Sequence, residues 1–331
     1  MAGYLDPSSA KTSHQASPVS ASETGHWAIG AAMLQADTSF CGISPRSAVG
    51  NTVGWLGSDF FPMATVRELL SDTWERGSPY EQYVGRWSRQ VAPRFLSWLG
   101  MPAGKRWLDV GCGTGALSAA IVDHCQPASV IGVEPSEGFL KTARENIGDR
   151  VALLQGTAAA LPLGDAEVDV SVCGLVLNFV PDPHAALAEM ARVTSHNGTL
   201  AAYVWDYAGR MELMRYFWDA AVTLDPNAVK LDEGARFPIC RPEALETLYT
   251  QAGLGDVQVA SIDIRTDFVD FDSYWRPFLG GQGPAPAYAM SLDEATRGRL
   301  RGLVRDRLPI DSNGSIALTA RAWAVRARVP G

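Results

Sequence analysis

The sequence predicts an α/β fold with a doubly wound, Rossmann-like sheet of mostly parallel strands. The first observation is a short apolar segment, Trp107–Val110, that breaks into a glycine-rich turn and then an alanine-rich helical run. A strand, a glycine turn and a helix N-terminus together form a nucleotide-binding corner. The second observation is that strand patterns alternate with helical patterns up to Trp205, which is typical of parallel sheets.

Each strand of the predicted core is a short apolar run. After the first strand, further strands are expected at 130–133, 151–154, 168–172 and 199–204. The segments between them carry apolar residues at helical spacing, so we expect the strands to lie parallel. Ser136 is expected to cap the helix that follows the second strand. Within the stretch 80–99, an amphipathic helix is expected after Arg89, with Pro93 in its first turn.

The second half of the chain is less regular and supplies two more strands. Alternating apolar patterns predict strands over 257–264 and 316–325, which brings the sheet to seven strands. Helices are expected at 211–224, 242–253, 272–278 and 292–308. A glycine-rich loop, 280–284, separates the last two helices. We interpret residues 63–331 as one domain.

The first 62 residues differ from the rest in composition. They are rich in Ser, Ala, Thr and Gly and have few apolar residues at regular spacing. This composition predicts a disordered tail, because little apolar surface is available to form a core. A second interpretation is that translation starts at Met63 and that the preceding residues are not part of the protein.

Composition and charge exclude several classes of protein. The 331-residue chain has a net charge of −8 and no basic stripe, which argues against a nucleic-acid partner. No apolar run is long enough to span a bilayer, and the N-terminus lacks the pattern of a signal peptide. The five cysteines lack C-x-x-C spacing and the five histidines form no ligand motif, so we expect neither a disulfide framework nor a metal site. These features predict a cytoplasmic protein.

The glycine-rich turn marks the expected ligand site. It reads Leu-Asp-Val-Gly-Cys-Gly-Thr-Gly over 108–115, and its third glycine comes one position too early for the dinucleotide fingerprint. Asp109 inside the motif would repel a pyrophosphate, but it suits a ligand that carries an ammonium group. Glu134 lies about 20 residues past the loop, where an acid can accept both hydroxyls of a ribose.

The glycine motif closely resembles the first motif of the class I S-adenosylmethionine (SAM) dependent methyltransferases. The chain is similar overall to the small-molecule enzymes of the quinone-biosynthesis type, with the best likeness over residues 80–205. The resemblance implies SAM as the cofactor of this core. It also implies that the sheet ends in an antiparallel hairpin at one edge. The segments 206–255 and 265–310 would then be helical insertions that cap the acceptor pocket.

The resemblance also implies a set of cofactor-binding residues. In this family the glycine loop cradles the aminoacyl part of SAM, and Arg86 is expected to pair with the methionine carboxylate. Thr157 stands where family members commonly carry an aspartate that bonds the adenine amino group. Its hydroxyl, or the backbone N–H of Ala158, is expected to contact the ring instead. The full set expected to bind the cofactor is Tyr83, Arg86, Asp109, Gly111, Cys112, Gly113, Gly115, Glu134, Pro135, Ser136, Gly156, Thr157, Ala158, Gly174 and Leu175.

The predicted reaction is transfer of a methyl group from SAM to a small-molecule acceptor by in-line displacement. The positive charge of the sulfonium already activates the methyl group, so orienting the reactants supplies much of the rate and a general base is not essential. Asn178 and His184 are the candidates for a catalytic role. The sequence identifies neither the acceptor nor the oligomeric state. Two other interpretations stay open: a SAM-binding protein without catalysis, and an NAD-type oxidoreductase on a related sheet.

Overall fold

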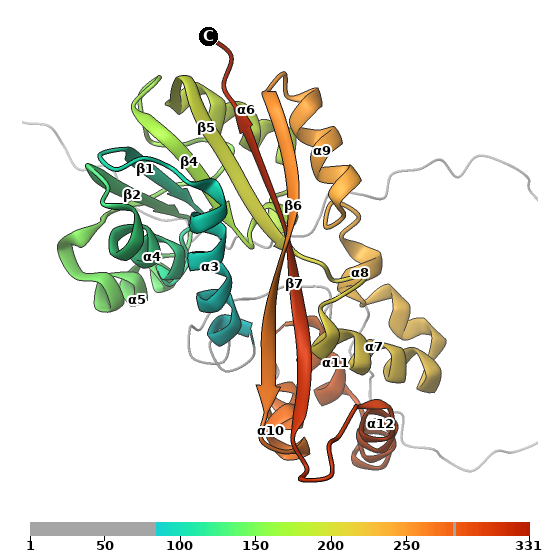
Figure 1. The fold of residues 1–331 in the computed structure, drawn as a ribbon. Coiled ribbons are helices and arrows are strands. Elements are labelled where there is room, and N and C mark those ends of the chain that lie inside the picture. The colour runs from blue at the N-terminus through green and yellow to red at the C-terminus, as the bar shows by residue number, and fades with distance from the viewer. Residues whose placement is uncertain (1–83, 281–282) are drawn as a thin grey trace, which may run out of the picture.

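A computed structural model of the chain describes residues 84–280 and 283–331, and a seven-stranded sheet runs through them (Figure 1). The strand order is β3-β2-β1-β4-β5-β7-β6. The strands are β1 (Arg106–Val110), β2 (Ser129–Glu134), β3 (Ala152–Gln155), β4 (Val168–Gly174), β5 (Thr194–Trp205), β6 (Gly255–Phe268) and β7 (Ile316–Arg328). The predicted tail, 1–62, and the predicted cofactor residue Tyr83 lie outside the described residues.

Helices and short 3-10 turns connect the strands. The helices are α3 (Arg86–Leu99), α4 (Ala116–Cys125), α5 (Glu137–Ile147), α6 (Pro183–Val193), α7 (Glu212–Leu224), α8 (Glu233–Arg236), α9 (Pro242–Gln251), α10 (Phe271–Trp275), α11 (Pro284–Ser291) and α12 (Glu294–Arg307). The 3-10 turns are η2 (Gly148–Arg150), η3 (Leu177–Phe179), η4 (Pro226–Lys230) and η5 (Arg276–Leu279). Phe95 of α3 packs on Tyr203 of β5, with ring centroids 4.7 Å apart, so the helix that precedes the first strand lies against the sheet.

Parallel pairing in the first five strands confirms the doubly wound fold. β1 pairs in parallel with β2 on one side and with β4 on the other, and β3 and β5 continue the sheet in the same orientation. The chain winds outward from β1 to β3 and then returns to β4 beside β1. The carboxyl ends of β1 and β4 therefore form the point where the winding reverses, which is where such sheets bind ligands.

The last two strands form the antiparallel hairpin implied by the family resemblance. β7 pairs with β5 from Thr199↔Arg328 to Trp205↔Ala322, and it pairs with β6 along its whole length. The hairpin thus extends beyond the rest of the sheet, and α7, α10, α11 and α12 gather around the extension (Figure 1). We call the extension and these four helices the C-terminal lobe. No helix of the described ranges is both long and apolar enough to cross a membrane.

One local prediction was wrong, and the helix α11 was not predicted. Pro93 lies in the interior of α3 rather than in its first turn, because the helix already begins at Arg86. Helix α11 begins at Pro284, the last residue of the predicted loop 280–284, and no helix was predicted over its length. Its sequence shows no amphipathic stripe because most of its residues are buried, and a helix that is buried on several sides carries no such pattern.

Candidate functional site

The glycine-rich turn forms a loop between β1 and α4 that is tied to β2. The backbone N–H groups of Gly111 and Cys112 both donate to the carbonyl oxygen of Val133, at 2.8 and 3.1 Å. Helix α4 then begins directly after Gly115. The loop therefore sits at the carboxyl end of β1, where the N–H groups of the first turn of α4 are available to a ligand.

Close packing explains why the loop needs glycine at two positions. Gly111 has a φ of +70°, and a Cβ there would lie 2.6 Å from Cγ1 of Val176. Gly115 has a φ of +88°, and its Cβ would lie 2.1 Å from Cδ1 of Ile147. Left-handed backbone and close approach both exclude a side chain, so α4 and α5 can pack tightly behind the loop.

Asp109 is a buried acid at the base of the loop. Its side chain is 1% exposed, and the hydroxyl of Ser118 donates to its Oδ2 at 2.6 Å. Within the described residues the carboxylate forms no ion pair, and desolvation raises the pKa of Asp109 to about 7. A buried carboxylate that lacks a cationic partner is a favourable site for a positively charged ligand group.

Glu134 faces the same loop from the end of β2. Its Oε2 accepts the N–H of Gly113 at 3.1 Å, and its Oε1 accepts the N–H of Ser136 at 3.0 Å. A carboxylate offers about four lone-pair positions, so each oxygen can accept one more hydrogen bond. Ser136 also accepts the N–H of Phe139 and caps α5, which confirms the predicted cap. Pro135, between Glu134 and Ser136, is exposed.

The predicted adenine-side segment follows β3. The N–H of Gly156 donates to the backbone oxygen of Glu134 at 3.3 Å, which places this turn beside the acid. Thr157 is exposed and its carbonyl accepts the N–H of Ala160, while Ala158 is half-buried. The side chain of Thr157 is therefore accessible, and its contact with an adenine ring stays a prediction.

Two residues of α6 hold the next stretch of chain, and the sequence analysis missed both. Arg192 donates to the carbonyl oxygens of Leu161 and Leu163, at 3.3 and 3.0 Å. Glu189 accepts the N–H of Leu161 at 2.9 Å and also pairs with Arg192. An Arg and a Glu one helical turn apart are common on exposed helices, so the sequence contained no signal for this role.

The end of β4 forms the opposite wall of the switch point. A Cβ on Gly174 would lie 2.7 Å from Oη of Tyr203, so only glycine fits there. Leu175 follows with a φ of +61°, and its N–H donates to the backbone oxygen of Tyr203 at 2.8 Å. A left-handed leucine is uncommon and costs about 1–2 kcal/mol, and such strain clusters at functional sites.

The two candidate catalytic residues differ in their surroundings. Asn178 lies in η3 and is 8% exposed, and its Nδ2 has no hydrogen-bond partner among the described residues. His184 is exposed in the first turn of α6. Beside Asn178, the ring of Phe179 packs edge-on against that of Phe237, with ring centroids 5.2 Å apart. The ring of Tyr207 lies 5.9 Å from the ring of Phe237. An orphaned amide next to aromatic rings favours Asn178 over His184 as a ligand contact.

Arg86 lies at the start of α3. Its guanidinium stacks on the ring of Trp87 at 4.3 Å, and it lies 5.2 Å from the ring of Phe268 in the hairpin. Burial lowers the pKa of Arg86 from its ordinary value. Its predicted pairing with a methionine carboxylate stays a prediction.

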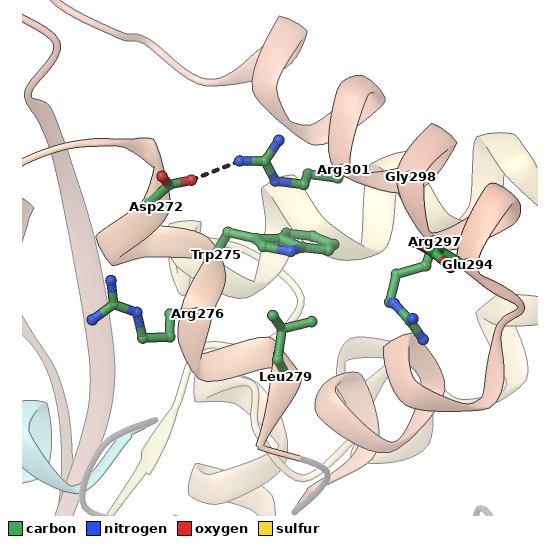
Figure 2. Close-up of a pocket in the computed structure, with 8 residues that line it drawn as sticks. All are labelled: Asp272, Trp275, Arg276, Leu279, Glu294, Arg297, Gly298 and Arg301. Carbon is green, nitrogen blue, oxygen red and sulfur yellow. Dashed lines mark hydrogen bonds and ion pairs between the residues drawn. The ribbon is translucent and has the colours of Figure 1, made fainter.

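A separate hollow lies in the C-terminal lobe, between α10, η5 and α12. Figure 2 shows Trp275 at its centre, with Leu279 beside it and charged side chains around the rim. Arg301 pairs with Asp272 at 2.6 Å, so the rim carries both signs of charge. None of the predicted site residues lies in this hollow.

Comparison with known proteins agrees with the geometry around the glycine loop. Residues 108–202 match the family described as a methyltransferase domain. This part of the chain resembles a methyltransferase domain. The matched residues run from β1 through β5 and so contain the glycine loop, Asp109 and Glu134. The family resemblance drawn from the glycine motif is confirmed.

The relatives of this methyltransferase domain align over part of their length. An uncharacterized methyltransferase of Mycobacterium tuberculosis is 35% identical over 133 residues, covering 40% of this chain and 49% of the relative. The demethylmenaquinone methyltransferase of Lactobacillus johnsonii is 30% identical over 144 residues, covering 42% and 59%. The chain thus spans about half the length of the curated relatives it matches.

A solved structure shares the fold of the methyltransferase domain. It is described as a methyltransferase from an antibiotic biosynthesis pathway of Anabaena variabilis. The two chains superpose with a TM-score of 0.50 at 21% sequence identity, over 71% of this chain and 96% of the other. The superposed 71% of this chain is a longer stretch than residues 108–202, so the likeness in fold extends beyond that segment.

Proposed function

We propose that the protein binds SAM and transfers its methyl group to a small-molecule acceptor. The observation that carries this proposal is the buried carboxylate of Asp109 at the base of the glycine loop. A pyrophosphate would be repelled by it, whereas the ammonium group of SAM would neutralise it. The match of residues 108–202 to methyltransferase domains supports the same cofactor.

The residues around the loop fit the other parts of SAM. Glu134 keeps one acceptor position on each oxygen for the two ribose hydroxyls, because Gly113 and Ser136 use one each. The turn over 156–158 would border the adenine, since Gly156 is hydrogen-bonded to the backbone of Glu134.

The protein has little chemistry to add beyond orientation. SAM supplies a methyl group on a positively charged sulfur, which makes it an activated donor. The residues of this chain would fix the donor at the switch point and hold the acceptor in line with it, and this ordering supplies much of the rate. A proton of the acceptor needs a base only where it must leave early.

Aromatic rings and one amide would meet the acceptor. The ring of Phe237, after α8, contacts Phe179, which follows β4, and Tyr207, which follows β5. Asn178 adds an amide donor that has no hydrogen-bond partner among the described residues. A planar acceptor that carries an oxygen atom would use both features. A demethylmenaquinone methyltransferase among the relatives supports an acceptor with a planar ring system.

Calorimetric titration of the full chain with SAM, S-adenosylhomocysteine and NAD tests the cofactor. Binding of SAM and its demethylated product, without binding of NAD, is the expected result. Binding of NAD alone would overturn the proposal. Formation of S-adenosylhomocysteine with a panel of phenols and quinols then tests catalysis, and binding without turnover on any acceptor would favour a non-catalytic SAM-binding protein.

A further inference from the structure

We propose that Ser118 is a positioning residue that holds the carboxylate of Asp109 ready for the ammonium group of the cofactor. The inference rests on the proposed function, since it assigns a role at the same site. Ser118 was not among the predicted site residues, and its position three residues beyond the last glycine of the loop gave no sequence signal for a ligand role.

The geometry places Ser118 directly behind Asp109. Ser118 lies in the first turn of α4 and is fully buried. Its hydroxyl donates to Oδ2 of Asp109 at 2.6 Å, which fixes one oxygen of the carboxylate and leaves Oδ1 for a ligand. Both the hydroxyl and the backbone N–H of Ser118 lower the pKa of Asp109. Helix α4 therefore presents two donors to one buried acid.

Among the other titratable neighbours of Asp109 in the described residues, none stabilises its ionised form. Glu134, from β2, is an acid that raises the pKa of Asp109. Cys112 in the loop and Cys173 on β4 are thiols whose own pKa values are raised by burial and by Asp109. In the described part of the chain, Ser118 supplies the one side-chain hydrogen bond to Asp109. Without this hydroxyl, a larger share of Asp109 is protonated at neutral pH and attracts an ammonium group less strongly.

Substitution of Ser118 by alanine tests the role directly. Alanine has the highest helix propensity, so the variant is expected to fold. Calorimetric titration with SAM at pH 7 should give binding at least about tenfold weaker, as expected for loss of a hydrogen bond to a charged group. The loss of affinity in Ser118→Ala relative to the parent should become smaller toward pH 9, where Asp109 is ionised in both proteins. Titration in buffers of different ionisation enthalpy should show that Ser118→Ala releases more protons on binding SAM at pH 7 than the parent does.

Three further variants separate the possible outcomes. Ser171→Ala removes a fully buried serine hydroxyl that bonds Thr194 at 2.6 Å, and it should leave SAM binding and its pH profile unchanged. Ser118→Thr keeps a hydroxyl and should restore the parent profile. In the Asp109→Asn background, Ser118→Ala should have no further effect on affinity.

Two results would count against the role of Ser118. One is parent-like affinity of Ser118→Ala at every pH, and the other is an equal loss at every pH with unchanged proton release. In both cases the parent still binds SAM, so the proposed function stands and only this inference is overturned. A parent protein that does not bind SAM would overturn the proposed function itself.

Discussion

Glu134 and Gly113 are joined across the glycine loop by a hydrogen bond of 3.1 Å from the backbone N–H of the glycine to Oε2 of the acid. The other oxygen of Glu134 accepts the N–H of Ser136. The carboxylate therefore links the loop after β1 to the cap of α5. Binding a ribose requires neither of these hydrogen bonds, so Glu134 also holds the loop and the start of α5 together in the absence of ligand.

Replacement of Glu134 by alanine should weaken SAM binding by at least about 100-fold. Two hydrogen bonds from hydroxyls to a charged group would be lost, each of about 1.5–3 kcal/mol. The hydrogen bond from the backbone N–H of Gly113 to Glu134 would be lost as well. Calorimetry measures the affinity, and Glu137→Ala, an exposed acid at the start of α5, is the matched control. Unchanged affinity in Glu134→Ala would remove Glu134 from the site.

Most of the fold could be predicted because each parallel strand is a short apolar run between helical patterns. The strand at 168–172 and the glycine turn at 111–115 depend on local sequence, and both are present as predicted. The hairpin was shorter in the prediction, because the next inward-facing position of β6 after Ile264 is the buried Thr266, so the apolar alternation stops there although the strand continues to Phe268.

The site was less predictable because several of its supports act through tertiary contacts. Asp109 and Glu134 followed from the motif and its spacing. No local sequence pattern predicts that Ser118 donates to Asp109 or that Arg192 donates to the carbonyl oxygen of Leu161, since hydroxyls and guanidinium groups are common on helices. The left-handed backbone of Leu175 depends on its bond to Tyr203, which no propensity predicts.

Asp109→Asn should stabilise the ligand-free protein above neutral pH. The pKa of Asp109 rises from 3.8 to about 7 on folding, so the folded state holds a proton that the unfolded state has lost between these values. Its contribution to stability is full below pH 4 and is lost as the pH rises through 7. The three-unit shift corresponds to about 4 kcal/mol at most.

The melting temperature at pH 5 and pH 8 measures this effect for Asp109→Asn. The parent should lose more stability than the variant between the two values. Asp306→Asn, an exposed acid on α12, should behave like the parent. Equal pH dependence in the parent and in Asp109→Asn would show that folding does not raise the pKa of Asp109.

Glu233→Gln should also stabilise the protein above neutral pH, at a site separate from Asp109. Glu233 is 3% exposed in α8, where the indole N–H of Trp218 donates to its Oε2. Burial raises the pKa of Glu233 from 4.5 to about 7, so its contribution to stability also falls as the pH rises across that range. Glutamine keeps the oxygen that accepts from Trp218 and carries no charge. The variant should melt higher than the parent at pH 8, whereas the exposed Glu243→Gln should not.

Arg192→Ala should loosen the chain that follows the adenine-side turn. Arg192 bonds the carbonyl oxygens of Leu161 and Leu163, so its removal leaves these groups without their side-chain donors. Hydrogen exchange measured by mass spectrometry should be faster over 157–165 and unchanged over α12. Arg144→Ala, an exposed arginine in the last turn of α5, is the control and should leave exchange over 157–165 at the parent rate.

Gly115→Ala should destabilise the protein more than Gly104→Ala, although both glycines have left-handed backbones. Their φ values are +88° and +76°, so alanine costs about 1–2 kcal/mol of backbone strain at either position. A Cβ on Gly115 would also lie 2.1 Å from Cδ1 of Ile147, whereas one on Gly104 meets nothing within 4 Å. Overpacking adds about 1–3 kcal/mol, and denaturant unfolding of the two variants measures the difference. Equal destabilisation would show that Ile147 moves aside and that α5 does not need to lie against the loop.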